Sequence, residues 1–263
     1  MSAVSTPGRI TDPAPAKSPG SRGRIRPLPV SVKPLTRFLP LAALCVSFLC
    51  ASLPAADLHY LRPGQPDTVA LLAPPPLPDS PEQASDLAAV IKAHKNSSAS
   101  DQTMAKSEKR VHIFSFAPAI GDFFQTNKLP KTEALFHRIH DDINGVIDAG
   151  KDFWKRPRPY LVEPSLAKGE QENSFSYPSG HSTHATVYAL LLAELVPDKR
   201  DDILAIGRSI GWRRVQIGRH YPTDIHAGRV LAQAIVRELK ASPAFQLDFA
   251  EARAEIQAAR QKP

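Results

Sequence analysis

The spacing of apolar positions along the chain predicts a protein built from helices. Between residues 132 and 154, apolar side chains return every three or four positions, which is the period of one buried helix face. This stripe consists of Leu135, Ile139, Ile143, Val146 and Ile147. No segment alternates apolar and polar residues over the length of a β-strand. The pattern therefore favours an all-α fold in a single helical domain.

Start and stop signals set the bounds of the other helices. Ser80 followed by Pro81 is typical of a helix start, with serine as the cap and proline in the first turn. The polar residues 96–102 are predicted to break that helix. Pro157 and Pro159 end the helix that begins near residue 132. After a polar loop, further helices are predicted at residues 179–195, 198–217, 222–240 and 245–260.

The first 56 residues have the pattern of a secretory signal peptide. Residues 1–37 are rich in Pro, Ser, Gly and Arg and contain too few bulky apolar side chains to fold by themselves. The apolar run that follows, residues 38–50, is shorter than the ~20 residues of a membrane-spanning helix. Basic residues precede this run and small residues follow it, so we predict export with cleavage near Ala56. An uncleaved membrane anchor is the alternative interpretation.

Removal of residues 1–56 changes the composition of the chain. These residues hold +6 of the net charge of +7, so the rest is close to neutral and nucleic-acid binding is not expected. Both cysteines, Cys45 and Cys50, also leave, and with them any thiol nucleophile, disulfide or thiolate metal site. The mature chain divides into a Pro-rich extended arm, residues 57–80, and a helical domain, residues 81–263. No stable membrane span is expected in it.

Three short segments at helix boundaries combine the residue types that phosphoryl transfer without a metal ion needs. They are residues 151–159, 177–181 and 214–224. The transition state spreads negative charge over three oxygens, and Lys151, Arg158 and Arg214 can supply the opposing positive charge. Arginine adds a planar fork of donors that suits phosphate geometry. These three residues are therefore candidate phosphate ligands.

The second segment lies directly before an apolar helical run. Ser179 is predicted to cap this helix, and Gly180 lets the backbone approach a ligand closely. The first N–H groups of the helix would then point at an anion. His181 is a candidate acid or base at the same place.

The third segment contains a histidine and a carboxylate four residues apart. Pro222 is predicted to begin a helix between His220 and Asp224. A carboxylate in this position can hold the Nδ1–H group of the imidazole and leave the other nitrogen free to attack. We therefore predict that His220 and Asp224 act as a pair.

Together, the three segments resemble the signature of the type 2 phosphatidic acid phosphatase and vanadium haloperoxidase superfamily, K-x6-R-P, P-S-G-H and S-R-x5-H-x3-D. Within it, the chain is most similar to the class A bacterial non-specific acid phosphatases, which are also secreted and begin with a Pro-rich segment. One position departs from the signature, because Arg213 stands where the family has serine. This departure is expected to affect fine positioning more than activity. The alternative is an extra cation beside the pocket that alters substrate preference.

The resemblance implies the chemistry as well as the fold. It implies an all-helical domain of the acid phosphatase and vanadium haloperoxidase type. A phosphohistidine intermediate would form on His220, and His181 would donate a proton to the leaving alcohol. The implied phosphate-binding residues are Lys151, Arg158, Ser179, Gly180 and Arg214.

The sequence thus favours a periplasmic or secreted acid phosphatase that hydrolyses phosphate monoesters with His220, His181 and Asp224. Its expected partners are small-molecule phosphate esters, without a cofactor or a metal ion, and homo-oligomer formation stays open. His137 and Asp141 share a helix face, but no further metal ligand can be named for them. Three alternatives use the same motifs: a lipid phosphate or pyrophosphate phosphatase, a vanadium-dependent haloperoxidase, and a phosphate-binding protein with a decayed site.

Overall fold

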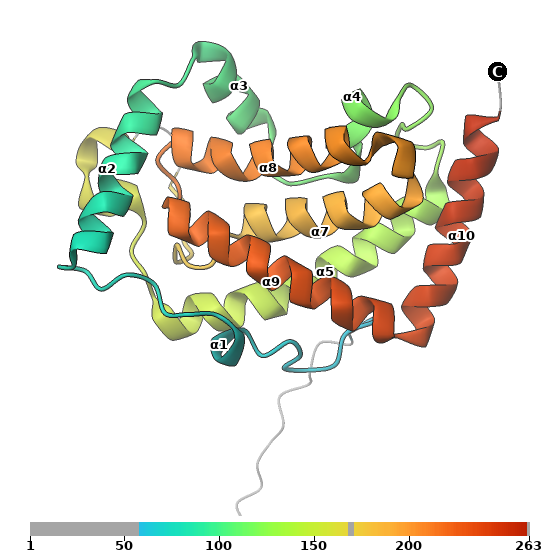
Figure 1. Ribbon diagram of the computed structural model, residues 1–263, viewed down its shortest axis with the longest axis horizontal. Coiled ribbons are helices and arrows are strands. Elements are labelled where there is room, and N and C mark those ends of the chain that lie inside the picture. Colours follow the sequence, from blue (N-terminus) through green and yellow to red (C-terminus); the bar gives the residue numbers. More distant parts are fainter. Residues whose placement is uncertain (1–57, 168–170, 262–263) are drawn as a thin grey trace, which may run out of the picture. The chain divides into compact units, whose positions relative to one another are not determined.

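The computed structural model describes residues 58–167 and 171–261, and its regular elements there are all helices (Figure 1). The predicted signal peptide lies outside the described residues. The α-helices are α1 (Thr68–Leu71), α2 (Pro81–Lys95), α3 (Ala99–Ser107), α4 (Ala117–Ile120), α5 (Pro130–Trp154), α6 (Pro159–Val162), α7 (Gly180–Leu195), α8 (Arg200–Gln216), α9 (Pro222–Ala241) and α10 (Pro243–Arg260). Short 3-10 helices are η1 (Ile113–Phe116), η2 (Pro164–Leu166) and η3 (Pro197–Lys199).

Most helix bounds agree with the predictions to within two residues. The Ser80 hydroxyl caps α2 by accepting from the backbone N–H of Gln83, and Pro81 is its first residue. Helix α5 buries the predicted stripe and ends at Trp154. The next residue, Lys155, has a positive φ of 49°, which turns the chain away before the two prolines are reached. All-α architecture is therefore confirmed for the described residues.

Helix α3 is the element that the sequence analysis missed. The predicted break at residues 96–102 is wrong beyond residue 98, because α3 begins at Ala99. Ser98 and Asp101 form a capping box, in which each side chain accepts from the backbone N–H of the other residue. This arrangement stabilises a helix start without apolar residues. A polar stretch that carries a capping box is thus a helix start here.

Helix α7 is the central helix of the described chain. It packs against α5, α8 and α9 (Figure 1). Its residues are buried on nearly all sides, including Val187, Leu191 and Leu192, which are fully covered. A helix with apolar residues all round is stable only where other helices surround it. Each fully buried aliphatic side chain contributes about 1.5–3 kcal/mol to folding.

Two glycines allow the neighbouring helices to approach α7 closely. A Cβ atom at Gly207 of α8 would lie 2.8 Å from the Cβ of Ala189, and one at Gly228 of α9 would lie 2.8 Å from the backbone oxygen of Ser179. Both distances are too short for carbon, so a side chain at either position would force the helices apart. Gly228 thereby sets the separation between α9 and the start of α7, where the site is predicted.

The Pro-rich arm is tied to the helical domain by one buried carboxylate. The arm was predicted to be extended, and it contains the short helix α1 at its centre. The carboxylate of Asp142 on α5 accepts from the backbone N–H groups of His59, Tyr60 and Leu61 at 2.7, 2.7 and 3.0 Å. Three donors satisfy a buried carboxylate well. Asp142 therefore anchors the arm.

A buried histidine lies between α5 and α7. The ring of His184 lies 4.5 Å from the ring of His140, measured between centroids. Its Nδ1 contacts the backbone oxygen of Gly180 at 2.9 Å, whereas its Nε2 has no hydrogen-bond partner among the described residues. Burial, followed by the neighbouring His140, lowers the pKa of His184 to about 4. The folded protein therefore keeps this imidazole neutral in mild acid.

We expect the protein to lose stability as pH falls from 6.5 towards 4. The pKa of His184 is depressed in the folded state, so the unfolded chain takes up a proton there that the folded chain does not. This difference amounts to on the order of 3 kcal/mol once pH reaches the folded pKa. The His184→Asn variant keeps a donor near Nδ1 and should show a flatter melting temperature against pH. The exposed His137→Asn variant is the control, and equal slopes in both variants would contradict the expectation.

Candidate active site

Backbone hydrogen bonds bring the three motif segments together at one end of the helix bundle. The N–H of Ser179, before α7, donates to the backbone oxygen of Asp224 in α9 at 3.1 Å. The N–H of Ser176 donates to the backbone oxygen of Arg156, just after α5, at 2.9 Å. The guanidinium of Arg158 donates to the backbone oxygen of Arg219 at 3.0 Å. The segments therefore share one site, although Arg158 and Arg219 are 61 residues apart in the chain.

His220 is held in a single tautomer. Nη1 of Arg158 lies 3.2 Å from Nε2 of His220, and a guanidinium can only donate, so Nε2 carries a lone pair. The proton is then on Nδ1, which lies 3.4 Å from both Oδ2 of Asp224 and Oγ of Ser176. Burial, together with the charges of Arg158 and Lys151, lowers the pKa of His220 well below its usual value. The imidazole is neutral, and Nε2 faces the cationic side.

Asp224 is positioned by more groups than the sequence analysis named. Its Oδ2 accepts from Oγ of Ser176 at 2.6 Å and from the N–H of Tyr221 at 2.9 Å. Its Oδ1 accepts from Nη1 of Arg156 at 2.5 Å. Burial raises the pKa of Asp224, and this ion pair with Arg156 opposes the rise. Arg156 lies inside the first segment and Ser176 directly before the second, but no pattern separated them from ordinary polar residues.

Arg156 connects the site to α2. Its second amino group donates to Oδ2 of the buried Asp86 at 2.7 Å and to Oε1 of Gln83 at 2.6 Å. Its guanidinium also lies over the ring of Tyr221, 4.0 Å from the centroid. One buried cation thus holds two buried carboxylates, those of Asp86 and Asp224. Without Arg156, both carboxylates would be buried without an ion-pair partner.

We expect the Arg156→Gln variant to be destabilised by about 3–5 kcal/mol, because removing one member of a buried ion pair leaves the other uncompensated. Denaturant unfolding of the variant measures this loss. The exposed neighbour offers the control, and Lys155→Gln should change stability by less than about 0.5 kcal/mol. Equal free energies of unfolding for the two variants would show that the ion pairs of Arg156 do not stabilise the protein.

Arg158 and Lys151 form the cationic floor of the site. Besides the contacts above, Arg158 donates from Nε to the backbone oxygen of Ser174 at 2.7 Å. Nζ of Lys151 donates to the backbone oxygen of Phe175, which also accepts from Arg158 at 3.3 Å. Burial, and then the charge of Arg158, lowers the pKa of Lys151 to about 8. Both side chains are buried, so their orientation is fixed before any ligand binds.

The start of α7 supplies the second wall. As predicted, Ser179 is the N-cap, and its hydroxyl accepts from the N–H of Ser182 at 3.3 Å. Gly180 and His181 are the first two helical residues, so their N–H groups precede the intrahelical hydrogen bonds. Nε2 of His181 contacts the backbone oxygen of Glu108 at 3.1 Å. Burial, followed by the charge of Arg214, lowers the pKa of His181 to about 3.

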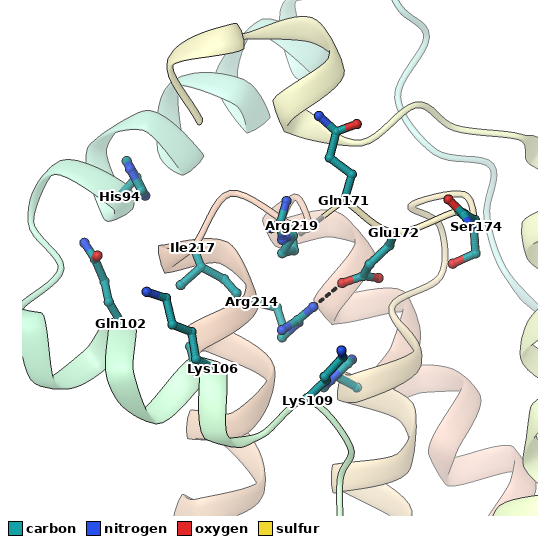
Figure 2. Close-up of a pocket in the computed structure, with 13 residues that line it drawn as sticks. His94, Gln102, Lys106, Lys109, Gln171, Glu172, Ser174, Arg214, Ile217 and Arg219 are labelled. Atoms are coloured by element: carbon teal, nitrogen blue, oxygen red, sulfur yellow. Dashed lines mark hydrogen bonds and ion pairs between the residues drawn. The ribbon is translucent and has the colours of Figure 1, made fainter. Parts of the chain in front are cut away.

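A cavity of about 640 Å³ opens above these residues. His181 and Arg214 line it, together with Glu172 from the loop before α7 (Figure 2). Figure 2 shows the carboxylate of Glu172 pointing at the guanidinium of Arg214, with which it forms an ion pair. Lys106 of helix α3 and Lys109, two residues beyond the end of that helix, contribute the opposite side. The sequence analysis predicted neither Glu172 nor α3 at the site.

Comparisons with known proteins agree with this geometry. A family model described as the PAP2 superfamily matches residues 139–245, which contain all three motif segments. The non-specific acid phosphatase of Providencia stuartii is 32% identical over 214 residues, which cover 76% of this chain and 85% of that protein. The chain belongs to the PAP2 superfamily and, within it, to the acid phosphatases.

Two further proteins are similar to different extents. The acid phosphatase of Zymomonas mobilis subsp. mobilis is 29% identical over 245 residues, covering 85% of this chain and 91% of that protein. A solved structure of a transmembrane PAP2 type phosphatidylglycerolphosphate phosphatase from Bacillus subtilis aligns with a TM-score of 0.45 and 19% identity, covering 62% of this chain and 87% of that chain. Within residues 58–167 and 171–261 of this acid phosphatase, no helix combines the length and apolar character needed to cross a bilayer.

Arg213 has a different place in this acid phosphatase from the one that the alternative interpretation gave it, which was an extra cation beside the pocket. Instead, its Nε donates to Oε2 of Glu108 at 2.7 Å, and a second ion pair joins the same two side chains. Arg213 lines a separate cavity with Trp212 and Arg208. Its charge is compensated by Glu108, so the alternative of an extra cation at the pocket is wrong.

The polar cluster on α5 has partners within the phosphatase fold. His137 pairs with Asp141 at 3.1 Å, His140 lies beside His184, and Asp142 anchors the arm. Among the residues that the structure describes, no group of three or more His, Cys, Asp or Glu side chains is arranged to hold a metal ion. His137 and Asp141 thus pair within α5, whereas His140 and Asp142 join α5 to its neighbours.

Proposed function

We propose that this acid phosphatase is exported and hydrolyses phosphate monoesters through a phosphohistidine on Nε2 of His220. One observation carries the proposal: the lone pair of Nε2 faces a buried arginine, while Nδ1–H is directed at a carboxylate. A neutral imidazole in this orientation is a nucleophile, and the cations beside it stabilise the charge of the phosphoryl group. Export rests on the pattern of residues 1–56.

In the first step, Nε2 of His220 attacks phosphorus and the bond from phosphorus to the alcohol oxygen breaks. The imidazole becomes cationic and is stabilised by Asp224, as in the histidine and aspartate pairs of other enzymes. His181 gives a proton to the departing oxygen. The equatorial oxygens are bound by the side chains of Arg158, Arg214 and Lys151. The start of α7, at Ser179 and Gly180, binds them as well.

In the second step, a water molecule replaces His220 on phosphorus. His181, now neutral, takes a proton from this water, and phosphate leaves while Nε2 regains its lone pair. His181 is well suited to both roles, because its Nε2–H group can donate to the backbone oxygen of Glu108 and leave Nδ1 to exchange the proton. A bound phosphoryl group would raise the low pKa of His181 by charge attraction, which favours proton uptake with the substrate.

A substrate panel tests the proposal. Protein starting at residue 57 should release phosphate from p-nitrophenyl phosphate and from nucleotides in mildly acidic buffer with a chelator present. Exchange of His181 for alanine should lower kcat by about 10²–10⁴-fold, the range for loss of a general acid. A preference for lipid phosphates or pyrophosphates, or halide oxidation with vanadate and peroxide, would favour the alternative functions. Phosphate binding without any turnover would reject an enzymatic role.

A further inference from the structure

The carboxylate of Glu172 occupies the position between the two arginines of the site. Its Oε2 lies 2.6 Å from Nη2 of Arg158, and its Oε1 pairs with Nη2 of Arg214. Figure 2 shows Glu172 reaching from its loop towards Arg214 at the base of the cavity. One carboxylate thus bridges two guanidinium groups that come from different segments. These are the groups assigned above to the oxygens of the substrate.

The residues beneath Glu172 are shielded from the cavity. Arg158 is 2% exposed and His220 is 1% exposed, and neither lines the cavity. Glu172 itself lines it and has a side chain that is 30% exposed. A phosphoryl group that enters from the cavity therefore meets Glu172 before it meets Nε2 of His220.

We propose that Glu172 is an internal competitor for the phosphate site and a specificity-determining residue of this enzyme. In the ligand-free protein its carboxylate makes the ion pairs that the substrate makes later, and a substrate binds by replacing it. The inference rests on the proposed function for the identity of the site. The inference adds that the affinity of the site for an anion depends on a difference: the ion pairs that the arginines form with the anion, less those that they form with Glu172.

This difference selects ligands by charge. A phosphate monoester dianion carries two charges and three free oxygens, so it can pair with both guanidinium groups and still reach Lys151 or the start of α7. A phosphodiester or sulfate ester carries one charge, the same as the carboxylate that it must replace. Specificity is such a difference of affinities, and a built-in competitor raises the threshold for weaker ligands. Glu172 therefore favours monoesters over diesters.

The charge of Glu172 persists at the pH where an acid phosphatase works. Burial alone would raise the pKa of Glu172, but the guanidinium groups of Arg158 and Arg214, which pair with its carboxylate, outweigh burial and lower the pKa to about 2. A depressed carboxylate pKa means that the ion pairs are complete above the ordinary value of 4.5 and weaken as pH falls towards 2. Competition by Glu172 is thus present in mildly acidic buffer.

The test compares Glu172→Gln with Glu163→Gln. Glu163 is a matched control because its exposed carboxylate lies in the preceding segment and accepts from the backbone N–H of Ser165. Calorimetry should show inorganic phosphate binding on the order of tenfold more tightly to Glu172→Gln, as expected if an open site is populated about a tenth of the time in the parent protein. KM for p-nitrophenyl phosphate should fall similarly, and the ratio of kcat/KM for monoester over bis(p-nitrophenyl) phosphate should shrink. Glu163→Gln should match the parent protein in all three measurements.

Two results would overturn the inference. Weaker phosphate binding by Glu172→Gln would mean that Glu172 positions the arginines for the ligand, and unchanged binding would mean that it does not compete. Glu172→Ala provides a second variant if the first is poorly folded, and thermal melting identifies that case. The outcome is separable from the proposed function, because tighter phosphate binding by a protein without turnover would support the competitor and reject the phosphatase.

Discussion

Replacement of His220 by alanine is expected to lower kcat by at least about 10⁴-fold, the scale seen when a catalytic nucleophile is removed. Water would then have to attack phosphorus directly, with only the cationic groups of the site left to assist. Arg158 and Arg214 remain in the variant, so inorganic phosphate should still bind. Steady-state kinetics with p-nitrophenyl phosphate measures the loss, and calorimetry measures the binding.

The same variant tests the covalent intermediate. The parent enzyme, quenched within the first turnover, should carry a phosphoryl group that is stable in base and lost in acid, as a phosphohistidine is. The variant His220→Ala should carry none. His226→Ala changes an exposed histidine of the same helix, α9, and should retain parental kcat. More than about 1% of parental turnover in His220→Ala would remove His220 from the proposed role.

The Asp224→Asn variant is expected to lower kcat by about 10³–10⁴-fold with little change in phosphate affinity. Asparagine has the same shape but carries an amide N–H₂ group in place of one oxygen. If this group faces Arg156, two donors meet, and if it faces His220, it opposes the proton on Nδ1. The second arrangement favours the tautomer with a proton on Nε2, which removes the attacking lone pair.

A purely structural role for Asp224 would give a different result. Loss of packing would lower the melting temperature and weaken phosphate binding together, whereas loss of the tautomer lowers kcat in a protein that still binds phosphate. Asp79→Asn, in the exposed segment before α2, removes the same charge without touching the site and is the matched control. Equal kcat in the two variants would show that Asp224 has no part in the orientation of His220.

The long helices of the fold were predictable from their apolar content and their start signals, and two of them, α5 and α9, also carry a clear apolar stripe. Helix α5 buries its apolar stripe, and α9 begins at the proline that the sequence marks. Helix α3 was missed because it has few apolar residues and is stabilised at its start by side-chain hydrogen bonds. Capping boxes are local signals, so the spacing of Ser98 and Asp101 could have identified this start.

Some residues around the site were also predictable from the sequence, and others were not. The motif residues were found because histidines, arginines and lysine occur there in a recognisable order. Arg156 and Glu172 were not found, because a buried arginine and a bridging carboxylate resemble ordinary surface charges until their partners are known. The partners of Arg156 include Asp86, which lies 70 residues earlier in the chain. No spacing rule relates such distant positions.

The sequence by itself determined the helical class, the order of the three motif segments and the identity of the groups available for phosphoryl transfer. These features depend on local spacing and on residue chemistry, which a linear chain displays. Only the tertiary structure decided the contact of Arg158 with Nε2 of His220, the compensation of Arg213 by Glu108, and the position of Glu172 between two arginines. Each of these follows from contacts between segments that are distant in the chain, and their energies depend on burial, which arises only when the helices pack.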